Sequence, residues 1–107
     1  MTKREARVIM PTSEHYTNAW LREQLTKTFG GCTETKGFGN WVDASGKVVS
    51  ENVTIYDVAM TGNFQDWHIL RGFARQAAIM ANQDCVYVRN AQGEVFLVRQ
   101  ENWSVRE

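Results

Sequence analysis

Five β-prone runs enclose two segments with helical periodicity, and this order constrains the fold more than any other feature of the sequence. The helical segments repeat apolar residues every three to four positions. The other runs are short and rich in β-branched and aromatic residues, which favour strands. The sequence therefore predicts an α+β protein with the element order β-α-β-β-α-β-β.

The first part of the chain is predicted to form a strand and a helix. Residues 6–10 form a β-prone run that Pro11 ends, because proline cannot donate a hydrogen bond to a neighbouring strand. Thr12 or Ser13 is placed to cap the helix that follows. An apolar stripe predicts that this helix runs from about His15 to Thr28, and the glycines that follow the stripe are typical of a helix C-terminus. The stripe and the glycines are Leu21, Leu25, Phe29, Gly30 and Gly31.

Glycine is concentrated in the next segment. Five of the eight glycines fall between Gly30 and Gly46, which predicts a loose, mobile connection up to about Trp41. The run Asp43-Ala44-Ser45-Gly46 lies between two short β-prone runs. It fits a type I turn completed by a glycine with positive φ, so we expect a tight hairpin there.

The second half is predicted to contain a strand, a helix and a terminal hairpin. Residues 53–60 alternate with a period of two, and both sides are apolar. Asp66 is a candidate cap for a helix whose stripe is rich in alanine, and residues 85–89 and 94–99 form the hairpin. With both helices on one face of a mainly antiparallel sheet, this is a ferredoxin-like sandwich. We expect four residues on its other face, as a dimer interface or ligand cavity: Tyr56, Val58, Tyr87 and Phe96.

The 107 residues suit a single domain, residues 1–107, with residues 101–107 as a flexible or docking tail in which Trp103 meets the sheet edge or a partner. Twelve basic residues balance twelve acidic ones, so neither nucleic acid nor an anionic membrane is an expected partner. No run approaches the about 18 apolar residues of a membrane span. We expect a cytoplasmic protein with Cys32 and Cys85 as free thiols.

Few residues are arranged for acid-base chemistry. His15 and His68 lie near predicted helix starts without a ligand partner three or four positions away, so we expect no metal site and no cofactor. Glu51 and Asp57 flank one strand and lie roughly 20 Å apart when extended, too far to share a proton. We therefore assign no catalytic residue.

The glycine-rich stretch contains the strongest candidates for ligand binding. Thr33, Thr35 and Lys36 offer hydroxyl and ammonium donors to an anionic group, and Trp41 offers a stacking face. The alternative is a mobile connection without a ligand. Arg71 lies one helical turn before Arg75, and a solvated helix face is the favoured explanation of the two. An anion that bridges their guanidinium groups is the alternative.

The run Phe29-Gly30-Gly31-Cys32-Thr33, with the glycines and Trp41 that follow and Glu51 before the Tyr56 strand, resembles a pattern in small uncharacterised bacterial and phage proteins. Those families are similar to ferredoxin-like dimers. The resemblance implies the fold and an origin in a phage or mobile element, with no catalytic residues to carry over. Glu51 and Tyr56 complete our set of ligand-binding candidates.

We favour a non-enzymatic binding protein, a homo-oligomer that holds a small anionic, nucleotide-like ligand or a host protein near the glycine-rich stretch. The alternative is a small cofactor-free enzyme on a dimeric ferredoxin-like sheet, with Tyr56, Tyr87, His68 and Arg89 as candidate residues. A third hypothesis is a structural subunit without a pocket.

Overall fold

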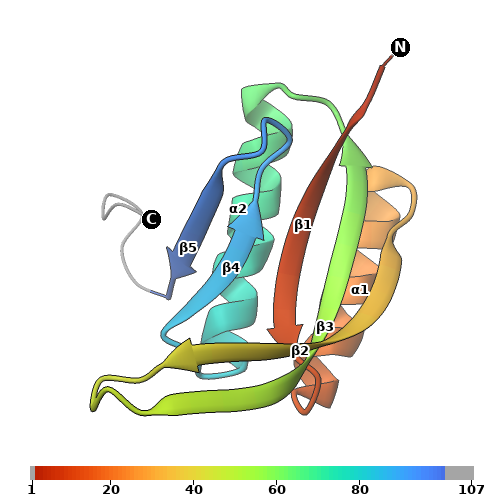
Figure 1. The fold of residues 1–107 in the computed structure, drawn as a ribbon. Coiled ribbons are helices and arrows are strands. Elements are labelled where there is room, and N and C mark those ends of the chain that lie inside the picture. The colour runs from red at the N-terminus through yellow and green to blue at the C-terminus, as the bar shows by residue number, and fades with distance from the viewer. Residues whose placement is uncertain (1, 101–107) are drawn as a thin grey trace.

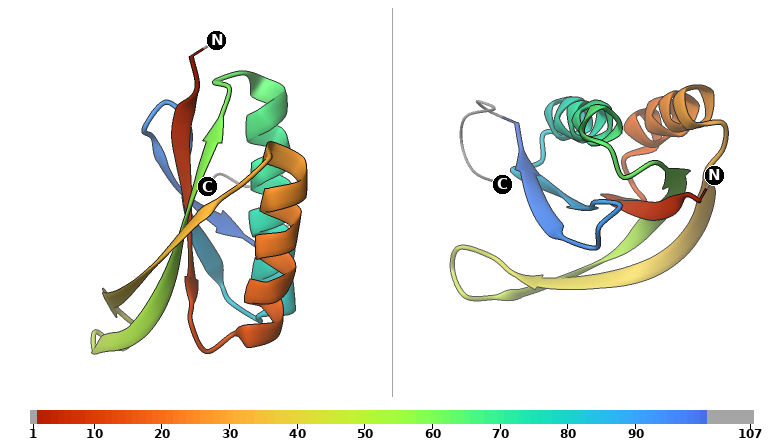
Figure 2. Two further views of the ribbon diagram at one scale, coloured as in Figure 1. Left: turned by 90° about the vertical axis from the view of Figure 1, so that its right-hand side faces the viewer. Right: turned by 90° about the horizontal axis from the view of Figure 1, so that it is seen from above.

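A computed structural model describes residues 2–100, which form one antiparallel sheet and two helices (Figure 1). The sheet has the strand order β2-β3-β1-β4-β5, so the N-terminal strand is central. Both helices cover the same face of the sheet (Figure 2). The predicted fold class and element order are therefore confirmed. The elements are β1 (Arg4–Pro11), α1 (His15–Phe29), β2 (Thr33–Val42), β3 (Val48–Met60), α2 (Phe64–Met80), β4 (Cys85–Arg89) and β5 (Val95–Arg99).

The core lies between the helices and one face of the sheet. Paired residues of antiparallel strands share a face, and Val8 pairs with both Tyr56 and Val88. These three side chains are fully buried. The helices contribute a leucine pair from α1 and an alanine-rich stripe from α2, as predicted. The helix residues with fully buried side chains are Leu21, Leu25, Leu70, Ala74, Ala77 and Ala78.

The opposite face of the sheet is open, and our prediction of its residues was largely wrong. Tyr56, Val58 and Phe96 lie on the helix side, and only Tyr87 faces away from the helices. The open face instead carries apolar residues at the other register positions, because both sides of the strands are apolar and alternation cannot tell them apart. These residues are Ile9, Ile55, Tyr87 and Leu97, which pair across four adjacent strands.

The predicted helix caps also need correction. The residue before α1 is Glu14, which makes no side-chain cap, so neither Thr12 nor Ser13 caps the helix. Asn63 caps α2 by accepting a hydrogen bond from the Asp66 amide, while Asp66 accepts two hydrogen bonds from Thr61. The C-terminal end of α1 is as predicted, since Gly30 has a φ of 92°.

The glycine-rich stretch is a regular strand rather than a mobile connection. Residues Thr33–Val42 pair with β3 along their whole length. At Gly37 and Gly39 an added Cβ would come within 3.2 Å of the Ile55 and Val53 side chains, respectively. The two glycines therefore make room for β3 side chains to lie over β2, which suits a strongly bent hairpin.

The β2–β3 hairpin projects beyond the rest of the sheet, on the side away from the helices (Figure 2). Its turn is the predicted one: Gly46 has a φ of 86°, and the amide of Asp43 donates to the carbonyl of Lys47. The Asp43 carboxylate accepts hydrogen bonds from Ser45 and Lys47, and these bonds lower its pKa. The hairpin is thus a defined arm of the molecule.

Within residues 2–100, no helix is long and apolar enough to cross a membrane. The predicted docking of Trp103 falls outside the described residues.

Candidate functional site

A cavity of about 400 Å³ lies at the turn between β1 and α1. Pro11 ends β1, and the amide of Thr12 then donates to the carbonyl of Asn52 at 3.0 Å, which holds the turn against β3. The turn and the neighbouring part of β3 therefore share one hollow. Its walls are formed by Thr12, Ser13, His15, Glu51 and Asn52.

Glu51 is the carboxylate of this cavity. Partial burial raises its pKa, and the negative charge of Glu14 raises it further. No hydrogen bond or ion pair to the Glu51 side chain is found among residues 2–100. A cationic group in the cavity would lower this pKa by pairing with the carboxylate.

A line of polar contacts runs behind the cavity to Lys36. The Lys36 ammonium donates to the Thr54 hydroxyl at 3.0 Å, and this hydroxyl lies 3.0 Å from that of Thr12. Thr54 is fully buried, so its hydroxyl depends on these two partners. Lys36 on β2 is thereby linked to the cavity wall.

A second buried contact holds the turn from the core side. The amide nitrogen of Asn18 donates to the carbonyls of Pro11 and Glu14 at 2.8 and 2.9 Å. The Tyr56 hydroxyl donates to the amide oxygen of Asn18 at 2.6 Å. Burial raises the pKa of Tyr56 to about 12, so the phenol remains protonated near neutrality.

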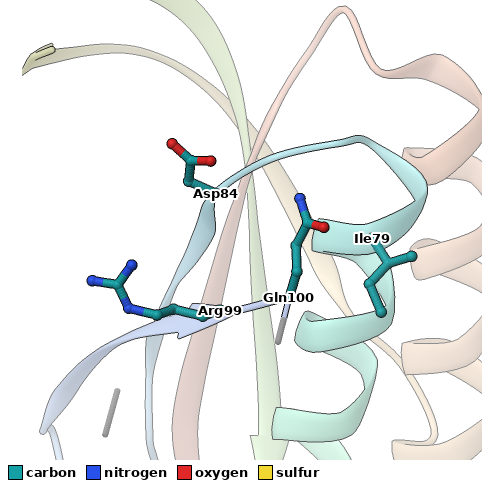
Figure 3. Close-up of a pocket in the computed structure, with 4 residues that line it drawn as sticks. All are labelled: Ile79, Asp84, Arg99 and Gln100. Atoms are coloured by element: carbon teal, nitrogen blue, oxygen red, sulfur yellow. The ribbon is translucent and has the colours of Figure 1, made fainter. Parts of the chain in front are cut away.

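A second cavity, of about 330 Å³, lies near the ends of α2 and β5 (Figure 3). It is lined by Ile79, Asp84, Arg99 and Gln100. The side-chain amide of Gln100 donates to the carbonyl of Gln83 at 2.5 Å, which ties the end of β5 to the turn before β4. We favour the first cavity, because it is lined by a predicted site residue, Glu51, whose pKa is raised.

Comparison with known proteins finds a match in fold alone. No protein-family model matches the chain, and no curated protein matches it in sequence. A phage SAM lyase in complex with S-methyl-5'-thioadenosine has a TM-score of 0.69 and 14% identity, over 94% of this chain and 92% of that chain. A phage SAM lyase in the apo state has a TM-score of 0.66 and 13% identity, over 92% and 90% of the two chains. Both are structures of a phage enzyme.

These matches contradict our prediction of a non-enzymatic binding protein. The structures that share this fold over nearly the whole chain are those of a lyase, so our preference against an enzyme was wrong. The alternative hypothesis, a small enzyme on a ferredoxin-like sheet, agrees better with them. The predicted similarity to phage proteins is supported at the level of fold.

The structure brings only some of the predicted site residues together. Glu51 lines the first cavity, and Lys36 reaches its wall through Thr54. Tyr56 is fully buried behind the same turn. Thr33 and Thr35 pair with open-face residues of β3, Trp41 lies on the hairpin, and Arg71 lies on α2.

The residues of the alternative hypothesis are also dispersed. Tyr87 and Arg89 lie on the open face, where Arg89 is 4.0 Å from Glu5. His68 is exposed on α2 and stacks on Phe64, with ring centres 5.8 Å apart. All of these assignments stay predictions.

Sequence reasoning missed Thr12, Ser13 and Asn52 as cavity residues, and it read His15 only as a helix-start residue. The available signal was a proline-ended strand followed at once by hydroxyl residues and a helix. We interpreted those hydroxyls only as caps. The contribution of Asn52 depends on how β3 passes the turn, which periodicity does not reveal.

Proposed function

We propose that this protein is a lyase that cleaves S-adenosylmethionine (SAM) and releases S-methyl-5'-thioadenosine. The shared fold with a phage SAM lyase supports the proposal. The observation on this chain that carries it is Glu51, a carboxylate of raised pKa in a cavity large enough for part of a nucleoside-sized ligand. The proposed ligand is a substrate, and a nucleoside with positive groups replaces the small anionic, nucleotide-like ligand that the sequence predicted.

The charge of the cavity suits this substrate. SAM carries a positive sulfonium and a positive ammonium group, and either would lower the raised pKa of Glu51 by pairing with its carboxylate. Glu14 adds a second negative charge nearby. The hydroxyls of Thr12 and Ser13 and the amide of Asn52 offer hydrogen bonds to the polar edges of the substrate.

The proposed reaction needs little acid-base chemistry. The bond between the sulfonium sulfur and the aminocarboxypropyl group breaks, and its electron pair neutralises the sulfur. A lyase adds no water, so the departing fragment is completed from within the substrate. Its own carboxylate oxygen attacks the carbon that leaves the sulfur, and the new C–O bond closes a lactone without a proton transfer. The leaving group needs no proton, and the protein therefore contributes mainly orientation and electrostatic stabilisation.

Incubation of the purified protein with SAM tests the proposal. We expect S-methyl-5'-thioadenosine to form well above the spontaneous rate, as followed by chromatography with mass detection. The Glu51→Gln variant keeps the shape of the side chain and loses its charge, so we expect a loss of about tenfold to a hundredfold in kcat/KM.

Glu23→Gln is the matched control, because Glu23 is exposed on α1 and lies 3.7 Å from Lys27. Its kcat/KM should equal that of the wild type. No product above the spontaneous rate from the wild-type protein would contradict the proposed reaction. Full activity in Glu51→Gln would instead reject the assigned site.

We also propose that the chain forms a homo-oligomer through its projecting hairpin. Four large apolar side chains are exposed on that hairpin, with exposed fractions from 43% to 65%. Clusters of this kind mark protein interfaces, and the open sheet face of a second copy offers an apolar partner surface. The four residues are Phe38, Trp41, Val42 and Val48.

A phage origin and a cytoplasmic location belong to the same proposal. SAM is a substrate of the cytoplasm, and the shared fold is that of a phage protein. Cys32 and Cys85 are free thiols in the structure, which suits a reducing compartment.

A further inference from the structure

The turn that forms one wall of the first cavity lies between two backbone carbonyls, those of Pro11 and Glu14, which are hydrogen-bonded to the same side chain. The carbonyl of Pro11 is the last of β1, and that of Glu14 immediately precedes α1. Both accept hydrogen bonds from the amide nitrogen of Asn18, at 2.8 and 2.9 Å. Thr12 and Ser13, which lie between these carbonyls, line the cavity.

These two hydrogen bonds form in only one orientation of the Asn18 amide. An asparagine amide has an oxygen and a nitrogen of nearly equal size, and a flipped amide would turn its oxygen toward both carbonyls. The Tyr56 hydroxyl donates to the Asn18 oxygen at 2.6 Å and so favours the orientation that holds the turn. Asn18 is only 5% exposed, so water is a poor substitute for this donor.

Tyr56 is well suited to act as a fixed donor. Its side chain is fully buried between the sheet and α1, and its strand pairs with β1 at Val8. Burial raises its pKa, which keeps the hydroxyl protonated. The tyrosine also belongs to the strand that carries Glu51, so one strand supplies both the cavity carboxylate and the donor behind the turn.

We infer that Asn18 and Tyr56 are a positioning pair, which holds the turn from Pro11 to Glu14 in the conformation that binds substrate. The inference rests on the proposed function for the identity of the ligand. It does not require either side chain to touch that ligand.

The test uses Tyr56→Phe, which removes one oxygen atom from the core. We expect this variant to bind S-methyl-5'-thioadenosine roughly fivefold more weakly, measured by calorimetry at a temperature where it is fully folded. Hydrogen exchange of the peptide covering residues 11–16 should be faster by a similar factor. Asn18→Ala removes both side-chain hydrogen bonds to the turn and keeps the backbone one to Glu14. It provides the same test if Tyr56→Phe does not fold.

Tyr16→Phe is the matched control. Tyr16 is 81% exposed at the start of α1, so the same substitution beside the same turn should change neither affinity nor exchange. If Tyr56 had a purely structural role, Tyr56→Phe would lower the melting temperature and leave the affinity of the folded protein unchanged. Unchanged affinity and unchanged exchange in folded Tyr56→Phe would overturn the inference.

The exchange measurement separates this inference from the proposed function. If the wild-type protein does not bind S-methyl-5'-thioadenosine, the proposed function fails. Faster exchange of residues 11–16 in Tyr56→Phe would then still support the positioning pair, and unchanged exchange would reject it.

Discussion

At the scale of single residues, the carboxylate of Glu51 lies where its own charge is disfavoured. Burial and the charge of Glu14 raise its pKa, and no cation among residues 2–100 is paired with it. A binding site for a cationic substrate is expected to have this property, because groups that bind a ligand often cost stability in its absence. The sequence placed Glu51 among the candidates, but its pKa is raised first by burial and then by the charge of Glu14, and both depend on the fold.

This arrangement predicts that Glu51 opposes folding at neutral pH. A carboxyl whose pKa is raised on folding contributes stability below its unfolded-state pKa, and this contribution is lost as pH rises through the folded-state value. Glu51→Gln should therefore raise the free energy of unfolding at neutral pH. The gain should vanish in acid, where Glu51 is protonated in both states.

Urea denaturation at several pH values measures the difference. Glu34→Gln is a control in which the free energy of unfolding should change in the opposite direction, because the hydrogen bonds from Arg22 lower the pKa of Glu34. That variant should lose stability at neutral pH, and its difference from the wild type should shrink as pH falls. A destabilised Glu51→Gln at neutral pH would refute the electrostatic account.

At the scale of elements, β2 shows where local sequence information ends. The hairpin turn was predictable, because Asp43 and Gly46 suit a type I turn with a glycine of positive φ. Strand β2, which precedes the turn, was not predictable from the local sequence, because its glycines have low strand propensity. Pairing with β3 overrides that propensity, and the side chains of Val53 and Ile55 occupy the space that the glycines leave.

Gly39 should therefore tolerate substitution poorly. In Gly39→Ala the added methyl group would lie 3.2 Å from a methyl group of Val53, so the Val53 side chain must move by a few tenths of an ångström within its packed surroundings. We expect a loss of about 1–3 kcal/mol in the free energy of unfolding, measured by chemical denaturation. Gly31→Ala is the control, because an added Cβ there meets nothing within 4 Å. Equal stability of the two variants would show that the hairpin adapts without cost.

At the scale of the whole molecule, the helices leave one sheet face open, and the hairpin projects on the side of that face. The element order sufficed to predict the fold class. Each helix connects two parallel strands with one strand between them, β1 to β2 and β3 to β4, and right-handed crossovers of this kind place both helices on one face. The assignment of residues to faces failed for Tyr56, Val58 and Phe96. Both sides of these strands are apolar, so only the packed helices distinguish them.

The functional prediction failed for a chemical reason. The sequence shows no acid-base set, and we took this absence as evidence against an enzyme. The substrate that we propose is a sulfonium, which already carries a good leaving group, so a site that acts on it would need few catalytic side chains. The cavity also depends on a turn and on part of β3 that are far apart in sequence.

The exposed hairpin predicts association that depends on concentration. In sedimentation experiments, the average mass of the wild-type protein should rise above that of the monomer. Phe38→Ser should shift the equilibrium toward the monomer, because Phe38 is 65% exposed on the hairpin. Phe64→Ser is the control, since Phe64 is 76% exposed at the start of α2. A wild-type monomer at every concentration would exclude the homo-oligomer.

The central position of β1 also affects how the chain is made. Of the five strands among residues 2–100, β1 leaves the ribosome first, yet its neighbours β3 and β4 come from the middle and the last part of the chain. Val8 and Met10 of nascent β1 are therefore exposed until β4 has been synthesised. Folding that depends on such distant contacts is slow, so this strand is the segment that chaperones would need to protect during translation.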